Sequence, residues 1–174
     1  MQQRRSLRGV GLRLAAAVVS IVSVSSARAR AADLQGWGGG LGLFDITQEE
    51  EAFELGVDYQ FRELAKLWRI APLLGVGATS DEAVFVYGGV RRAFRLRESS
   101  WYAVPNFAVT LFDRADGKDL GQTLQFRSGI ELLRELRGGL RIGAGWYHIS
   151  NASLDEVNPG ANSLLLRVVW ARGR

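Results

Sequence analysis

Between Phe53 and Phe61 the chain reads Phe-Glu-Leu-Gly-Val-Asp-Tyr-Gln-Phe, with an aromatic or aliphatic residue at every odd position. The even positions hold Glu, Gly, Asp and Gln instead. Successive side chains of a β-strand point to opposite faces, so this pattern predicts a strand with one apolar and one polar face. A carboxylate is costly to bury in a wholly apolar medium, so the polar face must meet water or a polar interior.

Alternating segments of this kind, separated by clusters of turn-forming or charged residues, recur along the chain. We can draw about seven of them, each near the length of roughly ten residues that is typical of transmembrane β-strands. The segments are residues 41–47, 53–61, 85–97, 101–111, 124–132, 140–150 and 163–170. The first is rich in glycine and the 85–97 segment is crowded with arginine, so both are less regular than the others.

Aromatic placement decides between the two kinds of sheet that alternate in this way. A soluble sheet would turn its polar face to water, whereas a transmembrane barrel would turn its apolar face to lipid. Trp101, Trp146 and Trp170 lie near segment ends, where a membrane interface favours such rings. The length of the domain accommodates eight strands of about ten residues with their loops. We therefore expect an all-β protein, an eight-stranded antiparallel transmembrane β-barrel.

Residues 1–31 are interpreted as a signal peptide, with a basic start, an apolar stretch and small residues at cleavage spacing. Residues 32–174 are then one outer-membrane barrel domain. The whole chain has 22 Lys and Arg against 18 Asp and Glu, but six of the arginines lie in the leader. The remaining domain is slightly acidic, so nucleic acid is not an expected partner. Without any cysteine the domain has no disulfide.

The only histidine of the chain, His148, precedes Ser150 by two positions. On a strand both side chains share one face, with Cα atoms roughly 6–7 Å apart. An imidazole can reach a hydroxyl over that separation, which is the minimum for a base-activated serine nucleophile. Leu140 and Ile142 share the same face, so the pair would open onto an apolar surface. The alternative interpretation is a solvated polar girdle at the membrane interface.

Two short motifs near the C-terminus resemble one known family. They are His-x-Ser-Asn-Ala at residues 148–152 and Asn-x-Gly at residues 158–160, on the connection between the last two predicted strands. This pattern is similar to that of the PagL-type lipid A 3-O-deacylases. Members of that family are eight-stranded outer-membrane barrels that hydrolyse an ester-linked acyl chain of lipid A, with a His-Ser-Glu triad on the outer surface.

The resemblance implies a role for each matching residue. His148 matches the general base, Ser150 the nucleophile and Asn151 a residue of the oxyanion hole, while Asn158 and Gly160 match the turn. The position of the family's glutamate holds Asn162, which can accept a hydrogen bond from imidazole but cannot stabilise imidazolium by charge. The acidic residues Asp155 and Glu156 of the intervening loop are an alternative source of that charge.

The same resemblance implies an esterase that removes the 3-O acyl chain of lipid A in the bacterial outer membrane. Its partners would be lipid A or lipopolysaccharide and outer-membrane lipid, and it would need no metal and no organic cofactor. Four leucine and isoleucine residues of the apolar face are expected to form the acyl-chain groove. They are Leu140, Ile142, Leu164 and Leu166. Acyl-chain length preference and oligomeric state, a homodimer included, stay open.

Two rival functions follow from other features of the chain. A non-catalytic barrel that binds lipid or serves structure is favoured by Asn162 at the acid position. A soluble lipocalin-like carrier would place the polar faces outside and line a cavity with the apolar ones. The acidic stretch 113–119 could be interpreted as a Ca²⁺ loop, but an Asp-Gly hairpin turn is the simpler interpretation.

Overall fold

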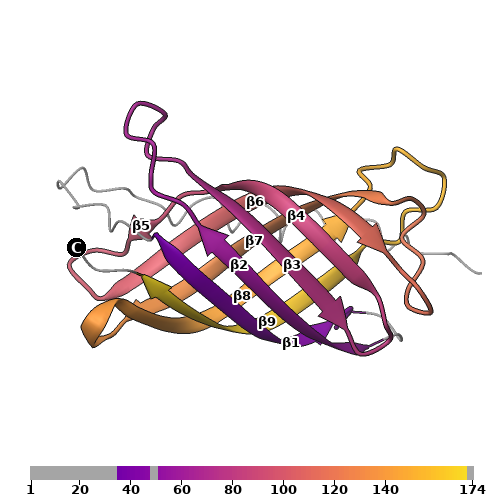
Figure 1. Ribbon diagram of the computed structural model, residues 1–174, viewed down its shortest axis with the longest axis horizontal. Coiled ribbons are helices and arrows are strands. Elements are labelled where there is room, and N and C mark those ends of the chain that lie inside the picture. The colour runs from indigo at the N-terminus through magenta and orange to yellow at the C-terminus, as the bar shows by residue number, and fades with distance from the viewer. Residues whose placement is uncertain (1–34, 48–50, 172–174) are drawn as a thin grey trace, which may run out of the picture.

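The computed structural model describes residues 35–47 and 51–171. They form eight long strands and the two-residue strand β5, all in one antiparallel sheet (Figure 1). The strands are β1 (Gly36–Phe44), β2 (Ala52–Gln60), β3 (Ala71–Thr79), β4 (Val84–Arg91), β5 (Phe94–Arg95), β6 (Trp101–Asp113), β7 (Leu124–Glu135), β8 (Leu140–Ser150) and β9 (Ala161–Ala171). The signal peptide predicted for residues 1–31 and its boundary with the domain lie outside the described residues.

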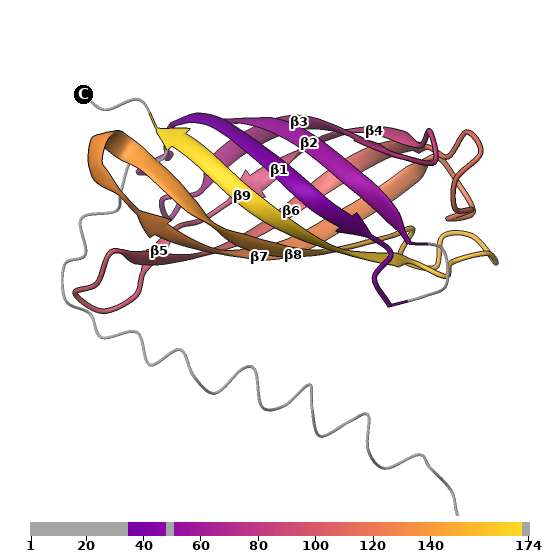
Figure 2. The ribbon, with the colours of Figure 1, turned by 90° about the horizontal axis from the view of Figure 1, so that it is seen from below.

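The sheet closes on itself, because β1 pairs with β9 and β4 pairs with β6 (Figures 1 and 2). Each remaining long strand pairs with its neighbours in the chain, and β5 pairs only with β6. The prediction of an eight-stranded antiparallel barrel is confirmed. Among the described residues, no helix has the length and apolar character needed to cross a membrane.

An even number of strands brings both described chain ends to one end of the barrel, where Gly36 and Ala171 are register partners. We call this the terminal end; its connections are residues 61–70, 92–100 and 136–139. The opposite, distal end carries the connections 80–83, 114–123 and 151–160, together with the residues that follow β1. The distinction matters because the candidate site lies at the distal end.

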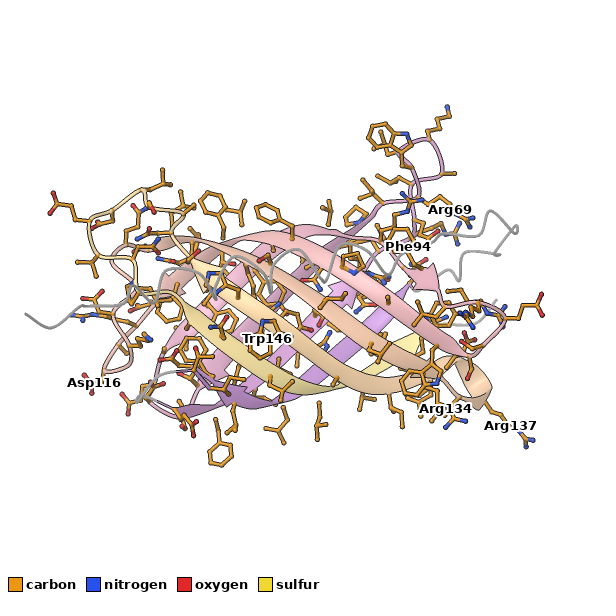
Figure 3. The ribbon with its side chains drawn as sticks, turned by 180° about the vertical axis from the view of Figure 1, so that it is seen from behind. Arg69, Phe94, Asp116, Arg134, Arg137 and Trp146 are labelled. Carbon is orange, nitrogen blue, oxygen red and sulfur yellow. The ribbon has the colours of Figure 1, made fainter. Side chains whose placement is uncertain are left out.

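The apolar faces of the strands point outward, and their polar faces point into the barrel. On β2, Phe53 and Leu55 are 66% and 60% exposed, whereas Glu54 is 1% exposed. Figure 3 shows side chains projecting all around the outer wall. This arrangement is the one that lipid requires, and it excludes the lipocalin-like carrier, whose apolar faces would line the interior.

The interior is held by a network of charged and aromatic side chains from different strands. Arg167 on β9 forms an ion pair with Asp58 on β2, and its Nε lies 3.3 Å from Oε1 of Glu131 on β7. Tyr147 on β8 donates a hydrogen bond of 2.6 Å to the same Glu131 oxygen. Arg127 on β7 lies 3.6 Å from the ring centroid of Tyr147. The network therefore ties four strands together across the barrel.

Apolar clusters pack on both sides of this polar network. The distal cluster includes Phe44, Phe85 and Phe112 from strands, and Leu120 from the β6–β7 connection. The terminal cluster consists of Tyr102, Val104, Leu133 and Val169. These residues are almost fully buried, so the barrel has a packed core and not an open channel.

The first strand differs from its prediction, since β1 spans Gly36–Phe44 and not 41–47. Its glycines make room for the interior. A Cβ atom on Gly38 would lie 2.6 Å from the carboxylate of Asp58 and 2.8 Å from the guanidinium of Arg167. A Cβ atom on Gly42 would lie 2.0 Å from the backbone oxygen of Leu164. The glycine run is therefore a strand whose missing side chains accommodate an ion pair and a close neighbour.

We predict that Arg167→Met destabilises the barrel, because it leaves Asp58 and Glu131 buried without their cation. Breaking a buried pair in this way costs about 3–5 kcal/mol. Urea unfolding in lipid vesicles, followed by gel mobility without boiling, measures the effect. The matched change Arg134→Met on the outward face of β7 should shift the transition by less than a third as much. Equal shifts for both variants would contradict a central role for the network.

Candidate functional site

The orientation of β8 is fixed by its inward residues. Tyr147 and Ile149 are 2% and 4% exposed and point into the barrel. His148 and Ser150 alternate with them and are partly exposed on the outer wall, in line with Trp146. The strand places the imidazole and the hydroxyl on one outward face at the distal end.

His148 is bonded through Nδ1 to a residue of the neighbouring strand. Its register partner on β9 is Asn162, whose Oδ1 accepts a hydrogen bond of 3.0 Å from Nδ1. An acceptor at Nδ1 holds the neutral imidazole in the tautomer that leaves Nε2 free to take a proton. Asn162 is therefore hydrogen-bonded to the imidazole, and the orienting role expected for it stays a prediction.

The carboxamide of Asn162 is held from its other side by Thr47, which follows β1. Asn162 Nδ2 donates a hydrogen bond of 2.8 Å to Thr47 Oγ1. The backbone N–H of Ile46 donates to the carbonyl oxygen of Asn162 over 3.0 Å, which fixes the chain beside it. Ser128 on β7 is the register partner of His148 on the side away from Asn162. A row of four polar side chains thus crosses the outer wall from β7 to the end of β1.

Gly160 leaves space for the imidazole ring. Its φ is +63°, which side chains other than glycine rarely adopt, and a Cβ atom there would lie 2.9 Å from Cε1 of His148. Residues 158–160 do not form the predicted tight turn, and the turn of this loop lies earlier, at residues 152–153. Leu154 N–H donates to the carbonyl oxygen of Asn151 over 3.1 Å.

Asn151 points into the barrel end and braces the loops. It is fully buried, and its Nδ2 donates to the carbonyl oxygens of Leu120 and Val157 over 3.1 Å and 2.8 Å. Its backbone N–H donates to Oδ1 of Asn158 over 3.1 Å. Both amide hydrogens of Nδ2 are used, so in this arrangement the side chain has no donor left for an oxyanion. The oxyanion role expected for Asn151 stays a prediction, and its side chain would have to leave these two carbonyl groups to take that role.

Asp155 and Glu156 lie exposed in the β8–β9 loop. Asp155 Oδ1 accepts a hydrogen bond of 3.0 Å from the backbone N–H of Val157. Among the hydrogen bonds of the described residues, neither carboxylate is bonded to the imidazole of His148. The partner of His148 Nδ1 is Asn162. The structure therefore does not place either acid beside the imidazole.

The four residues expected to form the acyl-chain groove are spread along the barrel wall. Leu164 pairs with Trp146, one outward position below His148, and Leu166 pairs with Ala144 one position further. Ile142 follows beyond, and Leu140 begins β8 at the terminal end beside Trp170. Leu140 is eight residues from His148, roughly 27 Å at about 3.4 Å per residue. Leu164 and Leu166 are thus the residues near the pair.

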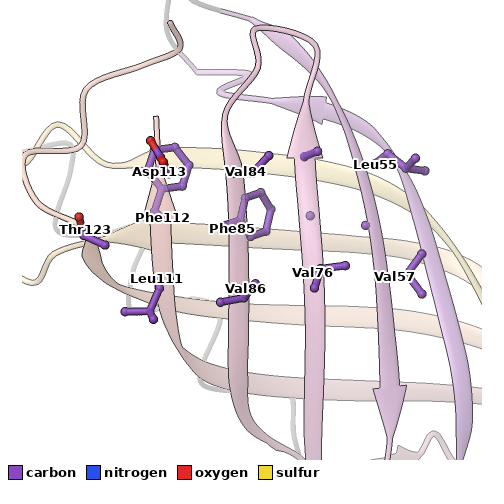
Figure 4. Close-up of a pocket in the computed structure, with 13 residues that line it drawn as sticks. Leu55, Val57, Val76, Val84, Phe85, Val86, Leu111, Phe112, Asp113 and Thr123 are labelled. Atoms are coloured by element: carbon purple, nitrogen blue, oxygen red, sulfur yellow. The ribbon is translucent and has the colours of Figure 1, made fainter. Parts of the chain in front are cut away.

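Other features of the described residues do not form a second site. The hollow in Figure 4 lies over β2, β3, β4 and β6, on the opposite wall from His148, and is lined by residues such as Val57, Val76 and Leu111. Within residues 35–47 and 51–171, no group of His, Cys, Asp and Glu could hold a metal ion. The 113–119 stretch is a turn, in which Arg114 pairs with Asp119 at 3.0 Å.

Comparison with known proteins identifies the class first. A crystal structure of the outer membrane enzyme PagL matches with a TM-score of 0.57 and 19% identity, covering 76% of this chain and 96% of that chain. A de novo designed transmembrane β-barrel matches with a TM-score of 0.50 and 8% identity, covering 80% and 98% respectively. The fold is that of an outer-membrane β-barrel. No curated protein sequence matches this chain.

The family follows from the sequence itself. The family model described as lipid A 3-O-deacylase (PagL) matches residues 64–171, which include β8, β9 and the loop between them. The chain belongs to the lipid A 3-O-deacylase (PagL) family. The expected resemblance is confirmed.

We predict that Asn151→Ala loosens the distal loops, because the carbonyl groups of Leu120 and Val157 lose their donor. A buried polar group left without its partner costs about 1–3 kcal/mol. Limited proteolysis in detergent should cut the 151–160 loop at least several-fold faster than in wild type. Asn158→Ser, which can still accept from the Asn151 N–H, should have a smaller effect. Unchanged cleavage in Asn151→Ala would contradict the bracing role.

Proposed function

We propose that the protein hydrolyses the ester bond of the 3-O-linked acyl chain of lipid A, with Ser150 as nucleophile and His148 as base. The observation that carries the proposal is the hydrogen bond between His148 Nδ1 and Asn162 Oδ1 on the lipid-facing wall. Membership in the lipid A 3-O-deacylase (PagL) family supports the substrate class.

The chemistry would proceed in two steps. Nε2 of His148 takes the proton of Ser150, whose Oγ forms a bond to the ester carbonyl carbon. The bond from that carbon to the 3-oxygen of the sugar breaks, and the imidazolium returns its proton to the leaving oxygen. Water, deprotonated by His148, then attacks the acyl carbon. The bond from that carbon to Ser150 Oγ breaks, the imidazolium returns the proton to Oγ, and the fatty acid leaves. The hydroxyl of Ser150 makes no hydrogen bond within the described residues, and apo sites often close this contact only when substrate binds.

The backbone could supply the oxyanion donors that the Asn151 side chain does not. Ala152 and Ser153 follow Ser150 closely and have φ values of 55° and 62°. Their N–H groups donate to no acceptor in the described residues, and successive N–H groups in turn conformations form anion-binding concavities. We assign the developing negative charge to these two groups.

The position of the pair suits a substrate that stays in the membrane. Below His148 the outer wall is apolar through Trp146, Leu164 and Leu166. Above it the polar loops of the distal end begin. An ester joins the polar and apolar parts of a lipid, so it would meet the pair at this boundary while its chain lies against the wall.

The direct experiment compares two serines that flank His148. Purified Ser150→Ala in detergent with lipid A should release less than a thousandth of the 3-O-linked fatty acid that wild type releases, by mass spectrometry. Ser128→Ala, the matched change on the register-partner strand, should keep at least half of the wild-type rate. Release by Ser150→Ala at the wild-type rate, or by neither wild type nor Ser128→Ala, would overturn the proposal.

A non-catalytic barrel that binds lipid is the second candidate, because Asn162 gives the imidazole no negative charge. A fluorophosphonate probe separates the two functions. We expect covalent labelling of wild type at Ser150, and labelling at least tenfold slower in His148→Ala. If wild type takes up no probe under conditions where it is folded, the non-catalytic function is favoured.

Thr47 provides a further test of the imidazole's orientation. An asparagine in this position is useful only with Oδ1 toward His148, since the reversed amide would favour the wrong tautomer. Thr47 Oγ1 accepts from Nδ2 and holds the carboxamide in place beside the imidazole. Thr47→Val should lower kcat about tenfold or more with little change in KM, whereas Thr47→Ser should restore it.

Asn162 gives the companion comparison at the same position. We expect Asn162→Leu to lose more activity than Thr47→Val, because it removes the acceptor for Nδ1 altogether. Asn162→Glu should keep or raise the rate, since a carboxylate also stabilises imidazolium. Equal kcat values in wild type, Asn162→Leu and Thr47→Val would remove both residues from the site.

A further inference from the structure

The two ends of the barrel carry opposite charges. The described connections of the terminal end contain seven basic residues and only two acidic ones, Glu63 and Glu98. The basic residues are Arg62, Lys66, Arg69, Arg92, Arg95, Arg97 and Arg137. In the described connections of the distal end acidic residues dominate. They are Asp45, Glu51, Asp81, Glu82, Asp116, Asp119, Asp155 and Glu156, against Arg114 and Lys118.

The β2–β3 connection, residues 61–70, is an ordered hairpin that presents apolar side chains. Leu64 and Ile70 form an isolated bridge, and Leu67 N–H donates to the carbonyl oxygen of Leu64 over 2.9 Å. At its tip Trp68 is 80% exposed and Leu67 57% exposed. In Figure 1 this connection stands out from the outline of the barrel. A fixed loop that holds an indole and a leucine away from the barrel marks an interaction surface.

Aromatic residues of the strands continue this surface around the terminal end. Trp37 on β1 and Trp170 on β9 are register partners, 63% and 69% exposed. Trp101 begins β6 beside Arg134 of β7, on the same outward face. Indole rings at the end of a transmembrane barrel lie at the level of the lipid headgroups. The exposed tip therefore extends a surface that already meets the membrane interface.

We propose that the 61–70 loop and the basic connections around it bind the anionic headgroups of the phospholipid leaflet at the terminal end. Trp68 and Leu67 lie in the boundary between headgroups and acyl chains. Basic side chains such as Lys66, Arg97 and Arg137 pair with lipid phosphates, whereas Arg69 already pairs with Glu63 at 3.2 Å. The charge of this end complements an anionic leaflet, which attracts clusters of Lys and Arg. The acidic side chains of the distal end would repel anionic headgroups. The preference for anionic lipid therefore concerns only the leaflet at the terminal end.

The proposal rests on the barrel and its charge, and holds whether or not the protein is a deacylase. The test uses the full chain in phosphatidylethanolamine vesicles that contain either brominated phosphatidylglycerol or brominated phosphatidylcholine. Bromine near the top of the acyl chains quenches nearby tryptophan. The emission of Trp68 is obtained as the difference between wild type and Trp68→Phe.

We expect brominated phosphatidylglycerol to quench the Trp68 emission about threefold more than brominated phosphatidylcholine. The triple variant Lys66→Gln, Arg97→Gln and Arg137→Gln should lose this preference. The distal change Arg114→Gln is the matched control and should keep it. Quenching by neither lipid would place Trp68 in water or against a protein partner, and equal quenching by both would show no headgroup preference. Either result overturns the proposal.

Discussion

The hydrogen bond between Tyr147 and Glu131 inside the barrel fixes which face of β8 meets the lipid. The ring of Tyr147 also lies under the guanidinium of Arg127, and Glu131 is paired with Arg167. A slip of one residue along β8 would move Tyr147 to the outer wall and His148 into the lumen. That slip would take the hydrogen bond of Tyr147 from Glu131 and its ring from Arg127, and losing a buried hydrogen bond is destabilising. The polar interior thus determines the chemistry of the exterior.

The loops of the distal end hold the side chains that surround His148 on β8. Asn151 ties the β8–β9 loop to the β6–β7 loop, and Gly160 leaves room for the imidazole where the chain enters β9. Thr47 brings the end of β1 to Asn162, a contact between residues 115 positions apart. The orientation of His148 therefore depends on barrel closure, since the first strand must reach the last one. The contacts that orient His148 therefore form only when the barrel closes.

The sequence predicts the faces of the strands because a period of two survives in most of them. β2, β6, β7 and β9 have the outward apolar faces that the alternation indicates. β3 was missed, because Leu73 and Leu74 are adjacent and Gly75 and Gly77 interrupt the pattern. These glycines make room for rings of β4, since Cβ atoms there would lie 2.3 Å and 2.2 Å from side-chain atoms of Tyr87 and Phe85. The sequence of β3 alone does not show that its glycines make room for aromatic rings on the neighbouring strand.

The candidate site was predictable to a different degree for each residue. His148 and Ser150 follow from spacing on one strand, and Asn162 from the motif. The inward turn of Asn151 was not predictable, since it depends on carbonyl groups of Leu120 and Val157 in two loops. Thr47 carries no motif, and only the pairing of β1 with β9 brings it to the site.

The outward placement of His148 and Ser150 can be measured directly, because the chain has no cysteine of its own. Single cysteines at positions 146 to 150 would carry a spin label in proteoliposomes, one variant at a time. Collision rates with oxygen, which concentrates in lipid, should be high at 146, 148 and 150 and low at 147 and 149. High rates at 147 and 149 instead, or no alternation, would contradict the account.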